Sequence, residues 1–332
     1  MSMNEIVLAP DFIQGAVSIE QKDGHLRPWR LPVDRLGLFP SPDDGLVLRA
    51  QMPAGVRVRF ETQARRVGLS FAPLIGEAKF DLVINRQVFQ TTTVGAGEYV
   101  AVFEDLPAGL KTADIWLPPD VPVGLRCLLV AGDAKPAADR RRKWIAYGSS
   151  ITHCCGAHSP ARTWPAVAAR KADLDLTCLG YGGQCHLDPM VARMIRDLPA
   201  DFVSMKVGIN IYGGGSLSPR TFKAAVIGAV QTIREKHPAI PIALISPIIS
   251  PPRESTANAV GLTLQLMRDE VREAAERLAA HGDGNIHYFS GLDLFSDDMV
   301  EAYLPDLLHP NGDGYELMGE NFIKTVLSRI RI

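Results

Sequence analysis

The chain has 332 residues, of which 46% are hydrophobic and 22% charged, with a formal net charge of −2 at pH 7. That length exceeds what one compact core usually takes, so we expect a soluble globular protein of two domains. The near-zero charge offers no general attraction to nucleic acid or anionic membranes, and no run approaches the roughly 20 apolar residues of a membrane span. These observations exclude nucleic-acid and membrane partners as the basis of function.

The cysteines bear on the cellular compartment. There are five, and those at 154, 155, 178 and 185 are clustered, an odd set that is not typical of a disulfide framework. Residues 1–12 contain no basic segment followed by a long apolar one, as a secretory signal would. We therefore expect a cytoplasmic protein with free thiols.

The first part of the chain has the rhythm of β-strands. Residues 55–63 alternate apolar and charged side chains, which indicates a half-buried strand with Arg57 on its polar face. Short apolar runs separated by turn residues continue over 67–132, and Asn85 marks a hairpin tip. No long amphipathic helix is apparent. The pattern predicts an antiparallel, jelly-roll-like β-sandwich over residues 1–135.

A linker is predicted at residues 136–142. Its basic run, from Arg140 to Lys143, raises the hypothesis of a nucleic-acid contact. Four charges without flanking aromatic residues favour a solvated linker instead.

Strands and helices alternate from residue 143 onward. Apolar strands are expected at 143–148, 174–180, 201–208, 240–246 and 285–290. Helices are expected at 159–172 (with Ser159 as N-cap and Pro160 at the first helical position), 188–198, 218–237, about 258–280, and from about 313. Near-continuous apolar strands between helices predict a five-stranded parallel sheet covered on both faces, in a three-layer flavodoxin-like α/β domain over 143–332.

Polar residues follow these strands where ligands bind in open α/β sheets, at the carboxyl ends of the strands. Ser150 follows the first strand, Gly183 the second, Asn210 the third, and Asp306 and His309 precede the last helix. A histidine can take the proton of a serine hydroxyl, and an aspartate can fix the imidazole tautomer. The serine N–H, a glycine N–H of the second loop and the asparagine amide can hold an oxyanion. The sequence therefore predicts a serine acyl-transfer site.

This arrangement resembles the SGNH, or GDSL-like, hydrolase superfamily. Four of the family's sequence blocks have counterparts, in order, at residues 148–152 (Gly-Ser-Ser-Ile-Thr), 178–183, 208–210 (Gly-Ile-Asn) and 306–310 (Asp-Leu-Leu-His-Pro). The resemblance implies that Ser150 is the nucleophile, that Asp306 and His309 complete a triad, and that Gly183 and Asn210 are oxyanion donors. Gly182 is an alternative to Gly183.

The chain departs from the family pattern at two positions. Ser149 stands where the first block has an aspartate, and Ile211 where an aspartate often follows the asparagine. Neither position carries the reaction in the family, and both changes make the site less acidic.

The resemblance implies a serine esterase that acts on carboxylic esters through an acyl-Ser150 intermediate, without a metal or organic cofactor. An acyltransferase that uses the same residues with an acceptor alcohol is the alternative, and an inactive carbohydrate-binding protein is a second one. A β-sandwich ahead of an SGNH domain is similar to some carbohydrate esterases, so the expected partner is a small-molecule or carbohydrate ester. The acyl group, the alcohol and the oligomeric state stay open.

A metal site is the competing interpretation of the first loop. His153, Cys154, Cys155 and His158 have metal-ligand chemistry, but adjacent cysteines point apart and no Cys-x-x-Cys spacing occurs. We therefore expect loop and core residues; a substrate contact from one of these histidines, or from His186, is the weaker hypothesis.

Two further charged residues stand out. Arg253 lies in a proline-rich loop at the same sheet edge, where it could clamp a substrate carboxylate, although a solvated arginine is the simpler interpretation. Lys206 lies inside the third expected strand, where a charge is unusual.

Overall fold

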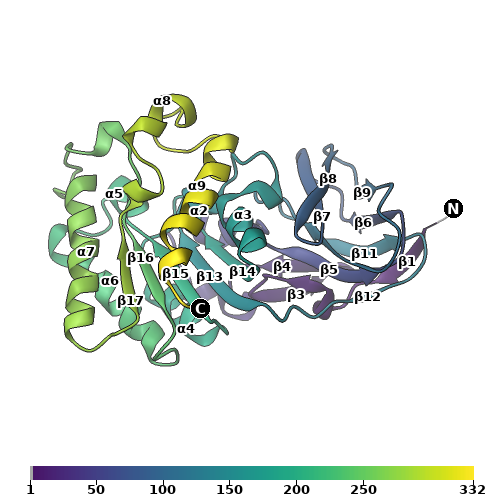
Figure 1. Cartoon of the computed structure of the whole chain (residues 1–332), viewed down its shortest axis with the longest axis horizontal. Helices are drawn as coiled ribbons and strands as arrows, with labels where there is room; N and C mark the ends of the chain where they lie inside the picture. Colours follow the sequence, from purple (N-terminus) through teal and green to yellow (C-terminus); the bar gives the residue numbers. More distant parts are fainter. Residues whose placement is uncertain (1–2) are drawn as a thin grey trace.

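Alternating side chains along β5 (Arg57–Thr62) organise the first part of the molecule, which is a computed structural model describing residues 3–332. Val58 and Phe60 are fully buried in an apolar core between two antiparallel sheets. The predicted antiparallel β-domain is confirmed, and it lies beside the α/β part along the long axis of the molecule (Figure 1).

The strands of this domain are divided between two antiparallel sheets. One has the order β3-β4-β11-β6-β9 with β1 paired to β11, and the other β12-β5-β10-β7-β8 with β2 paired to β5. The strands are β1 (Asn4–Val7), β2 (Ile13–Gln14), β3 (Ser18–Lys22), β4 (His25–Trp29), β6 (Val67–Phe71), β7 (Ala78–Ile84), β8 (Gln87–Val94), β9 (Val100–Phe103), β10 (Lys111–Trp116), β11 (Leu125–Val130) and β12 (Ala134–Pro136). The expected hairpin tip joins β7 to β8, where Asn85 and Arg86 both have positive φ, as a two-residue type I′ turn requires.

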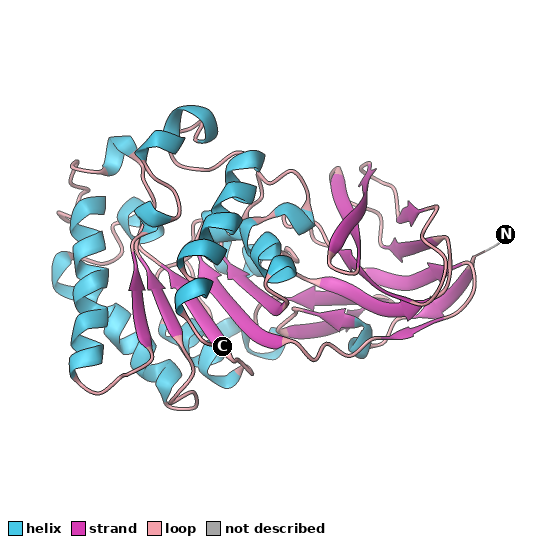
Figure 2. Ribbon diagram, viewed as in Figure 1, coloured by secondary structure: helices cyan, strands magenta, loops and turns pink. Residues whose placement is uncertain are grey.

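The second part is a parallel sheet between two helix layers, shown in magenta and cyan in Figure 2. Its order β14-β13-β15-β16-β17 is that of a flavodoxin-like fold, as predicted. The strands are β13 (Arg142–Gly148), β14 (Leu174–Gly180), β15 (Phe202–Lys206), β16 (Ile242–Ile245) and β17 (Ile286–Phe289). The helices are α2 (Ser150–His153), α3 (Trp164–Lys171), α4 (Pro189–Asp197), α5 (Ile209–Gly214), α6 (Pro219–Arg234), α7 (Leu264–Ala280), α8 (Val300–Tyr303) and α9 (Gly312–Thr325).

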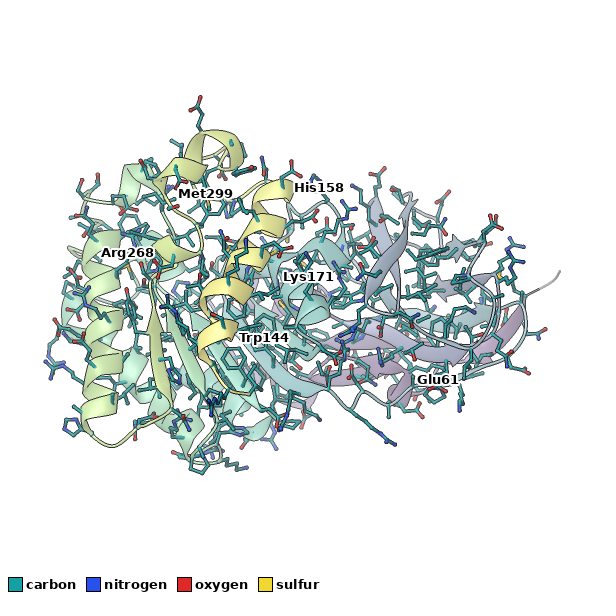
Figure 3. All side chains as sticks on the ribbon, viewed as in Figure 1. Glu61, Trp144, His158, Lys171, Arg268 and Met299 are labelled. Carbon is teal, nitrogen blue, oxygen red and sulfur yellow. The ribbon has the colours of Figure 1, made fainter. Side chains whose placement is uncertain are left out.

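Aromatic stacking fixes one helix layer to the sheet. The ring of Trp144 on β13, labelled in Figure 3, stacks on Phe322 of α9 with centroids 4.9 Å apart. Its indole N–H donates to Ser204 on β15. The other layer consists of α4, α6 and α7, which pack in sequence against one another. No helix among residues 3–332 is both long and apolar enough to cross a membrane.

Two helix starts differ from the sequence-based expectation. Residues 160–162 form a separate 3₁₀ turn, and α3 begins at Trp164, where the Thr163 hydroxyl accepts from Ala166 N–H. Ser159 therefore does not cap α3, because Thr163, four residues later, does. Similarly, α7 begins at Leu264 and is capped by Thr263 rather than starting near 258.

A short helix in the first part was missed. The six residues of α1 (Gly45–Ala50) are too few to show a helical period. Leu46 and Ala50 are buried in the core of the α/β part, so tertiary packing rather than propensity holds this helix.

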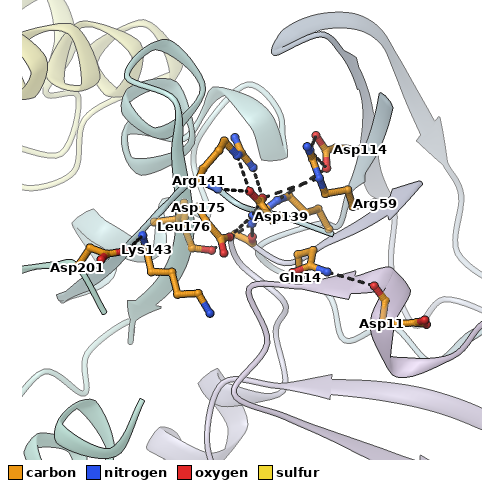
Figure 4. A network of polar contacts seen from close by, with 12 residues as sticks. Asp11, Gln14, Arg59, Asp114, Asp139, Arg141, Lys143, Asp175, Leu176 and Asp201 are labelled. Atoms are coloured by element: carbon orange, nitrogen blue, oxygen red, sulfur yellow. Dashed lines mark hydrogen bonds and ion pairs between the residues drawn. The ribbon is translucent and has the colours of Figure 1, made fainter. Parts of the chain in front are cut away.

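Strand β5 begins at a buried charge, which corrects the expectation for Arg57, whereas Arg59 and Glu61 on the same face are partly exposed as expected. The Arg57 guanidinium is fully buried and donates to the Asp139 carboxylate at 3.0 Å, to Asp175 on β14, and to the Leu176 carbonyl at 3.1 Å. Arg141 of the basic run joins the network through Asp139 and is not solvated (Figure 4). The Arg57 end of β5 thus forms an interface with β14, the edge strand of the parallel sheet.

Replacing Asp139 by asparagine should destabilise the protein. Burial alone would raise the pKa of the Asp139 carboxyl, but hydrogen bonds from Arg141 and the charge of Arg57 hold that pKa far below its usual range. The substitution leaves buried guanidinium groups short of a counter-charge, so we expect the free energy of unfolding in urea at pH 7 to fall by about 3–5 kcal/mol.

The same substitution has a defined pH dependence. Because the folded pKa of Asp139 is depressed, its stabilisation is present above about pH 4 and is lost as the pH falls through the folded value. The difference in the free energy of unfolding between wild type and Asp139→Asn should therefore narrow only in strong acid. A difference in that free energy that already vanishes at pH 6 would contradict this explanation.

Candidate active site

The loops at the carboxyl ends of the parallel strands meet around an open pocket of about 560 Å³. The lining residues are Arg49, Ser150, Cys155, Gly156, Gly182, Gly183, Asn210, Leu308, His309 and Tyr315. Four of the five predicted site residues thus line one pocket, and the fifth, Asp306, lies behind His309.

Ser150 occupies the first turn of α2, directly after β13. The preceding Ser149 caps this helix, since its hydroxyl accepts from Ile151 N–H. The cap holds Ser150 at the end of the strand, with its Oγ 2.9 Å from His309 Nε2. Within residues 3–332, no acceptor faces the Ser150 N–H, which leaves that donor free.

Asp306 accepts three hydrogen bonds within one tight loop, two from His309 and one from Leu308. Its Oδ2 lies 2.7 Å from His309 Nδ1, and its Oδ1 accepts from the N–H groups of His309 and Leu308 at 2.6 and 3.0 Å. Leu307 has a φ of 58°, a left-handed conformation that turns the chain back on the carboxylate. Burial opposes ionisation, but these hydrogen bonds prevail and lower the pKa of Asp306. The carboxylate therefore accepts a hydrogen bond from Nδ1–H, which leaves Nε2 free to accept one from the serine hydroxyl.

Gly182 and Gly183 differ in whether their N–H groups are occupied. Gly182 N–H donates to Nδ1 of His153 at 3.3 Å, whereas no acceptor in the described part of the chain faces Gly183 N–H. Gly183 also has a φ of 75°, which favours glycine. The free donor beside Ser150 is thus that of Gly183.

His153 is a core residue that holds this loop. Its side chain is fully buried, and burial together with the charge of Arg30 holds the pKa of His153 well below its usual range. Nε2 lies 2.6 Å from the Pro119 carbonyl, so the proton belongs on Nε2 and Nδ1 accepts from Gly182.

The orientation of the Asn210 amide follows from one backbone hydrogen bond. Asn210 Oδ1 accepts from Cys185 N–H at 3.1 Å. Since that N–H needs an acceptor, the oxygen faces Cys185 and the Nδ2 donors remain for the pocket. Three donors, Ser150 N–H, Gly183 N–H and Asn210 Nδ2, are therefore unused around the serine.

The sequence suggests an accessory, substrate-shaping role for the first domain but does not identify which of its residues reach the site. Arg30 is fully buried and donates to the carbonyls of Met52, Cys178, Gly180 and Arg49, while its guanidinium lies over the Tyr181 ring. Arg49 lines the pocket from α1. No local motif marks either residue, because both act through contacts with segments more than 100 residues away.

The remaining cysteines and histidines do not gather into a ligand set. All five cysteines are free. Among the described residues, no three His, Cys, Asp or Glu side chains are placed to hold a metal ion. His158 pairs with Asp313, and His186 contacts Ser216 and the Gly183 carbonyl. Neither histidine lines the pocket, and His153 is enclosed beneath it.

Arg253 does not line the pocket either. Its Nη1 donates to the Ser250 hydroxyl at 2.8 Å, and that hydroxyl donates to the Leu307 carbonyl at 2.7 Å. The arginine thus supports the loop that carries Asp306 and His309.

The chain matches two family models. The model of the GDSL-like Lipase/Acylhydrolase family matches residues 141–326, and that of the SsfX3 N-terminal domain matches residues 12–119. No curated protein matches the chain at a significant level.

Several solved structures are similar over nearly the whole chain. The salicylyl-acyltransferase SsfX3 from a tetracycline biosynthetic pathway is 32% identical, with a TM-score of 0.90, over 98% of this chain and 97% of that one. A putative GDSL-like lipase from Bacteroides ovatus is 21% identical, with a TM-score of 0.74, over 97% and 95%. A family two carbohydrate esterase from Clostridium thermocellum, in complex with cellohexaose, is 16% identical, with a TM-score of 0.62, over 82% and 92%. The last two likenesses show the fold alone.

Lys206, at the end of β15 beneath the site, should make stability depend on pH. Burial lowers the pKa of Lys206 to about 8. Between that value and about pH 10.5 the unfolded chain binds a proton that the folded chain does not, so stability rises with pH in this window. Lys206→Met should remove that rise and should stabilise the protein at pH 7 by up to about 3 kcal/mol.

The measurement is urea unfolding of wild type, Lys206→Met and the exposed control Lys22→Met at pH 7 and pH 10. If Lys206→Met lowers stability at pH 7, or if both variants keep the wild-type pH slope, the buried charge is not the cause.

Proposed function

The chain belongs to the GDSL-like lipase/acylhydrolase family, and from its site we propose that it is a serine esterase that cleaves carboxylic esters through an acyl-Ser150 intermediate. One observation carries this proposal: Ser150 Oγ, His309 and Asp306 form a continuous hydrogen-bonded series, with distances of 2.9 and 2.7 Å. A serine hydroxyl at that distance from an oriented imidazole is an activated nucleophile.

The acylation step uses these atoms directly. Ser150 Oγ attacks the ester carbonyl carbon while His309 Nε2 takes the hydroxyl proton, and Asp306 stabilises the imidazolium that forms. The carbonyl oxygen, now negatively charged, receives hydrogen bonds from Ser150 N–H, Gly183 N–H and Asn210 Nδ2. Removing one such donor typically costs about 10²–10³ in kcat. His309 then protonates the leaving alcohol as the carbon–oxygen bond breaks.

Deacylation repeats the sequence with a second nucleophile. A water molecule attacks the acyl-Ser150 carbonyl and gives its proton to His309, which returns a proton to Ser150 Oγ. The His309 side chain is 38% exposed, and the pocket is open to solvent, so water can reach the acyl group. This access favours hydrolysis.

Acyl transfer to an alcohol is the second candidate. Its support is the likeness to SsfX3, which extends over both domains at 32% identity. An acceptor alcohol that occupied the open pocket would replace water in deacylation, with every other role unchanged.

Ser150→Ala should abolish reaction with a fluorophosphonate. We expect one adduct by intact-mass spectrometry on wild type and none on the variant. Ser159→Ala is the matched control, since its hydroxyl is buried without a hydrogen-bond partner among the described residues and should leave labelling intact. A folded wild type that takes up no label would refute the activated serine and would favour an inactive carbohydrate-binding protein.

Product analysis should separate hydrolysis from transfer. With a phenyl ester as acyl donor, we expect free acid to be the main product in water, and to remain so when a polyhydroxy acceptor such as cellobiose is added at millimolar concentration. Quantitative conversion to an acylated acceptor under these conditions would establish the transferase instead.

A further inference from the structure

One permanently charged side chain lies among the residues that line the catalytic pocket. Arg49 reaches it from α1, beside Gly182 and Gly183. A Cβ added to Gly182 would lie 3.4 Å from Arg49 Nε, so the arginine side chain passes directly over the loop that offers the Gly183 N–H. Arginine remains charged at every accessible pH, and its flat guanidinium matches the two oxygens of a carboxylate or phosphate.

This guanidinium has no counter-charge of its own. Within residues 3–332, no carboxylate forms an ion pair with Arg49, and its one side-chain polar contact is a long one from Nη1 to Met52 Sδ, at 3.7 Å. Two other arginines outside the pocket do pair with carboxylates: the half-buried Arg59 with Asp114 and the buried Arg268 with Glu254. The hydrogen-bonding capacity of Arg49 is therefore available to a ligand.

The backbone that carries Arg49 is also held in place. The Arg49 carbonyl accepts from Nη2 of the buried Arg30 at 2.5 Å. At the other end of α1, a Cβ on Gly45 would lie 2.4 Å from Gln184 Nε2, so the helix packs tightly on the glycine loop. The helix therefore presents Arg49 at a fixed position relative to Ser150 and Gly183.

We propose that Arg49 binds an anionic group, a carboxylate or phosphate, of the ester substrate, and so selects acidic esters; this rests on the esterase function proposed above. The anion sits either on the acyl group or on the alcohol, and both lie within the same open pocket. A charge-assisted pair with a half-buried guanidinium is worth about 10- to 100-fold in affinity.

The test compares matched esters on wild type and on Arg49→Gln. Monophenyl succinate carries the charge on the acyl side, and methyl phenyl succinate is its neutral counterpart. Para-acetoxybenzoate carries the charge on the alcohol side, with methyl para-acetoxybenzoate as counterpart. The readout is the ratio of kcat/KM for the acidic ester to that for its neutral counterpart. We expect Arg49→Gln to lower this ratio by about 10- to 100-fold for one pair, which identifies the side that carries the anion.

An unchanged ratio for both pairs would overturn the proposal, because a role of Arg49 at the oxyanion, or in folding alone, lowers both members of a pair alike. Arg253→Gln removes the same charge outside the pocket lining and is the control. A fall in the ratio with Arg253→Gln and not with Arg49→Gln would likewise overturn it.

Binding without turnover keeps this test separate from the esterase function. Calorimetric titration of Ser150→Ala, alone and combined with Arg49→Gln, measures the affinity for each intact ester. The quantity compared is again the ratio of the acidic ester to its neutral counterpart. Loss of anion preference in the double variant supports Arg49 even if wild type cleaves no ester, in which case only the esterase proposal fails. Equal affinities in both proteins refute Arg49 even if wild type is an active esterase.

Discussion

Strand β14 is the edge of a parallel sheet, and its outward carbonyls have no neighbouring strand to pair with. Two arginines of the first domain supply the missing donors: Arg57 binds the Leu176 carbonyl, and Arg30 binds those of Cys178 and Gly180. These are alternate residues, as a pleated strand requires. The two arginine side chains thus cover the edge of the sheet and fix the end of β14. The loop with Gly182 and Gly183 begins there, so the site depends on this interface.

Hydrogen bonds to neighbouring groups also explain why, among the described residues, the N–H groups of Ser150 and Gly183 remain free to bind a ligand. His153 occupies the N–H of Gly182, and the Asn210 oxygen occupies that of Cys185. The first hydrogen bond fixes the loop that carries Gly183, and the second orients the Asn210 amide; both residues line the pocket. The donors proposed for the oxyanion are therefore positioned by their neighbours, and in that role they would need no rearrangement when charge develops. The acidic partner of His309 is fixed in the same way, by backbone N–H groups of its own loop.

The site residues that sequence could predict are those whose chemistry lies within one loop. Asp306 and His309 are three residues apart, and Ser150 follows a strand that its apolar run identifies. The fold class followed from strand and helix periods in the same manner. What could not be predicted depends on contacts between distant segments. Arg57 alternates with apolar residues as on a surface strand, yet it is buried against β14, and α1 is too short to show a helical period. Two helix starts were placed too early, because the threonines that cap α3 and α7 lie four and five residues after the expected starts.

The separation of Arg30 from its partners has a consequence for how the protein is made. The carbonyls that accept from its guanidinium belong to residues up to 150 positions later in the chain. A growing chain emerges from the ribosome amino-terminus first, and domains fold as they appear. The first domain can therefore close around its own apolar core while Arg30 stays hydrated, because burying a charge without acceptors is unfavourable. The contact between Arg30 and the parallel sheet can form only after β14 has been synthesised, and the pocket only after His309 has followed, so the pocket is a late product of translation.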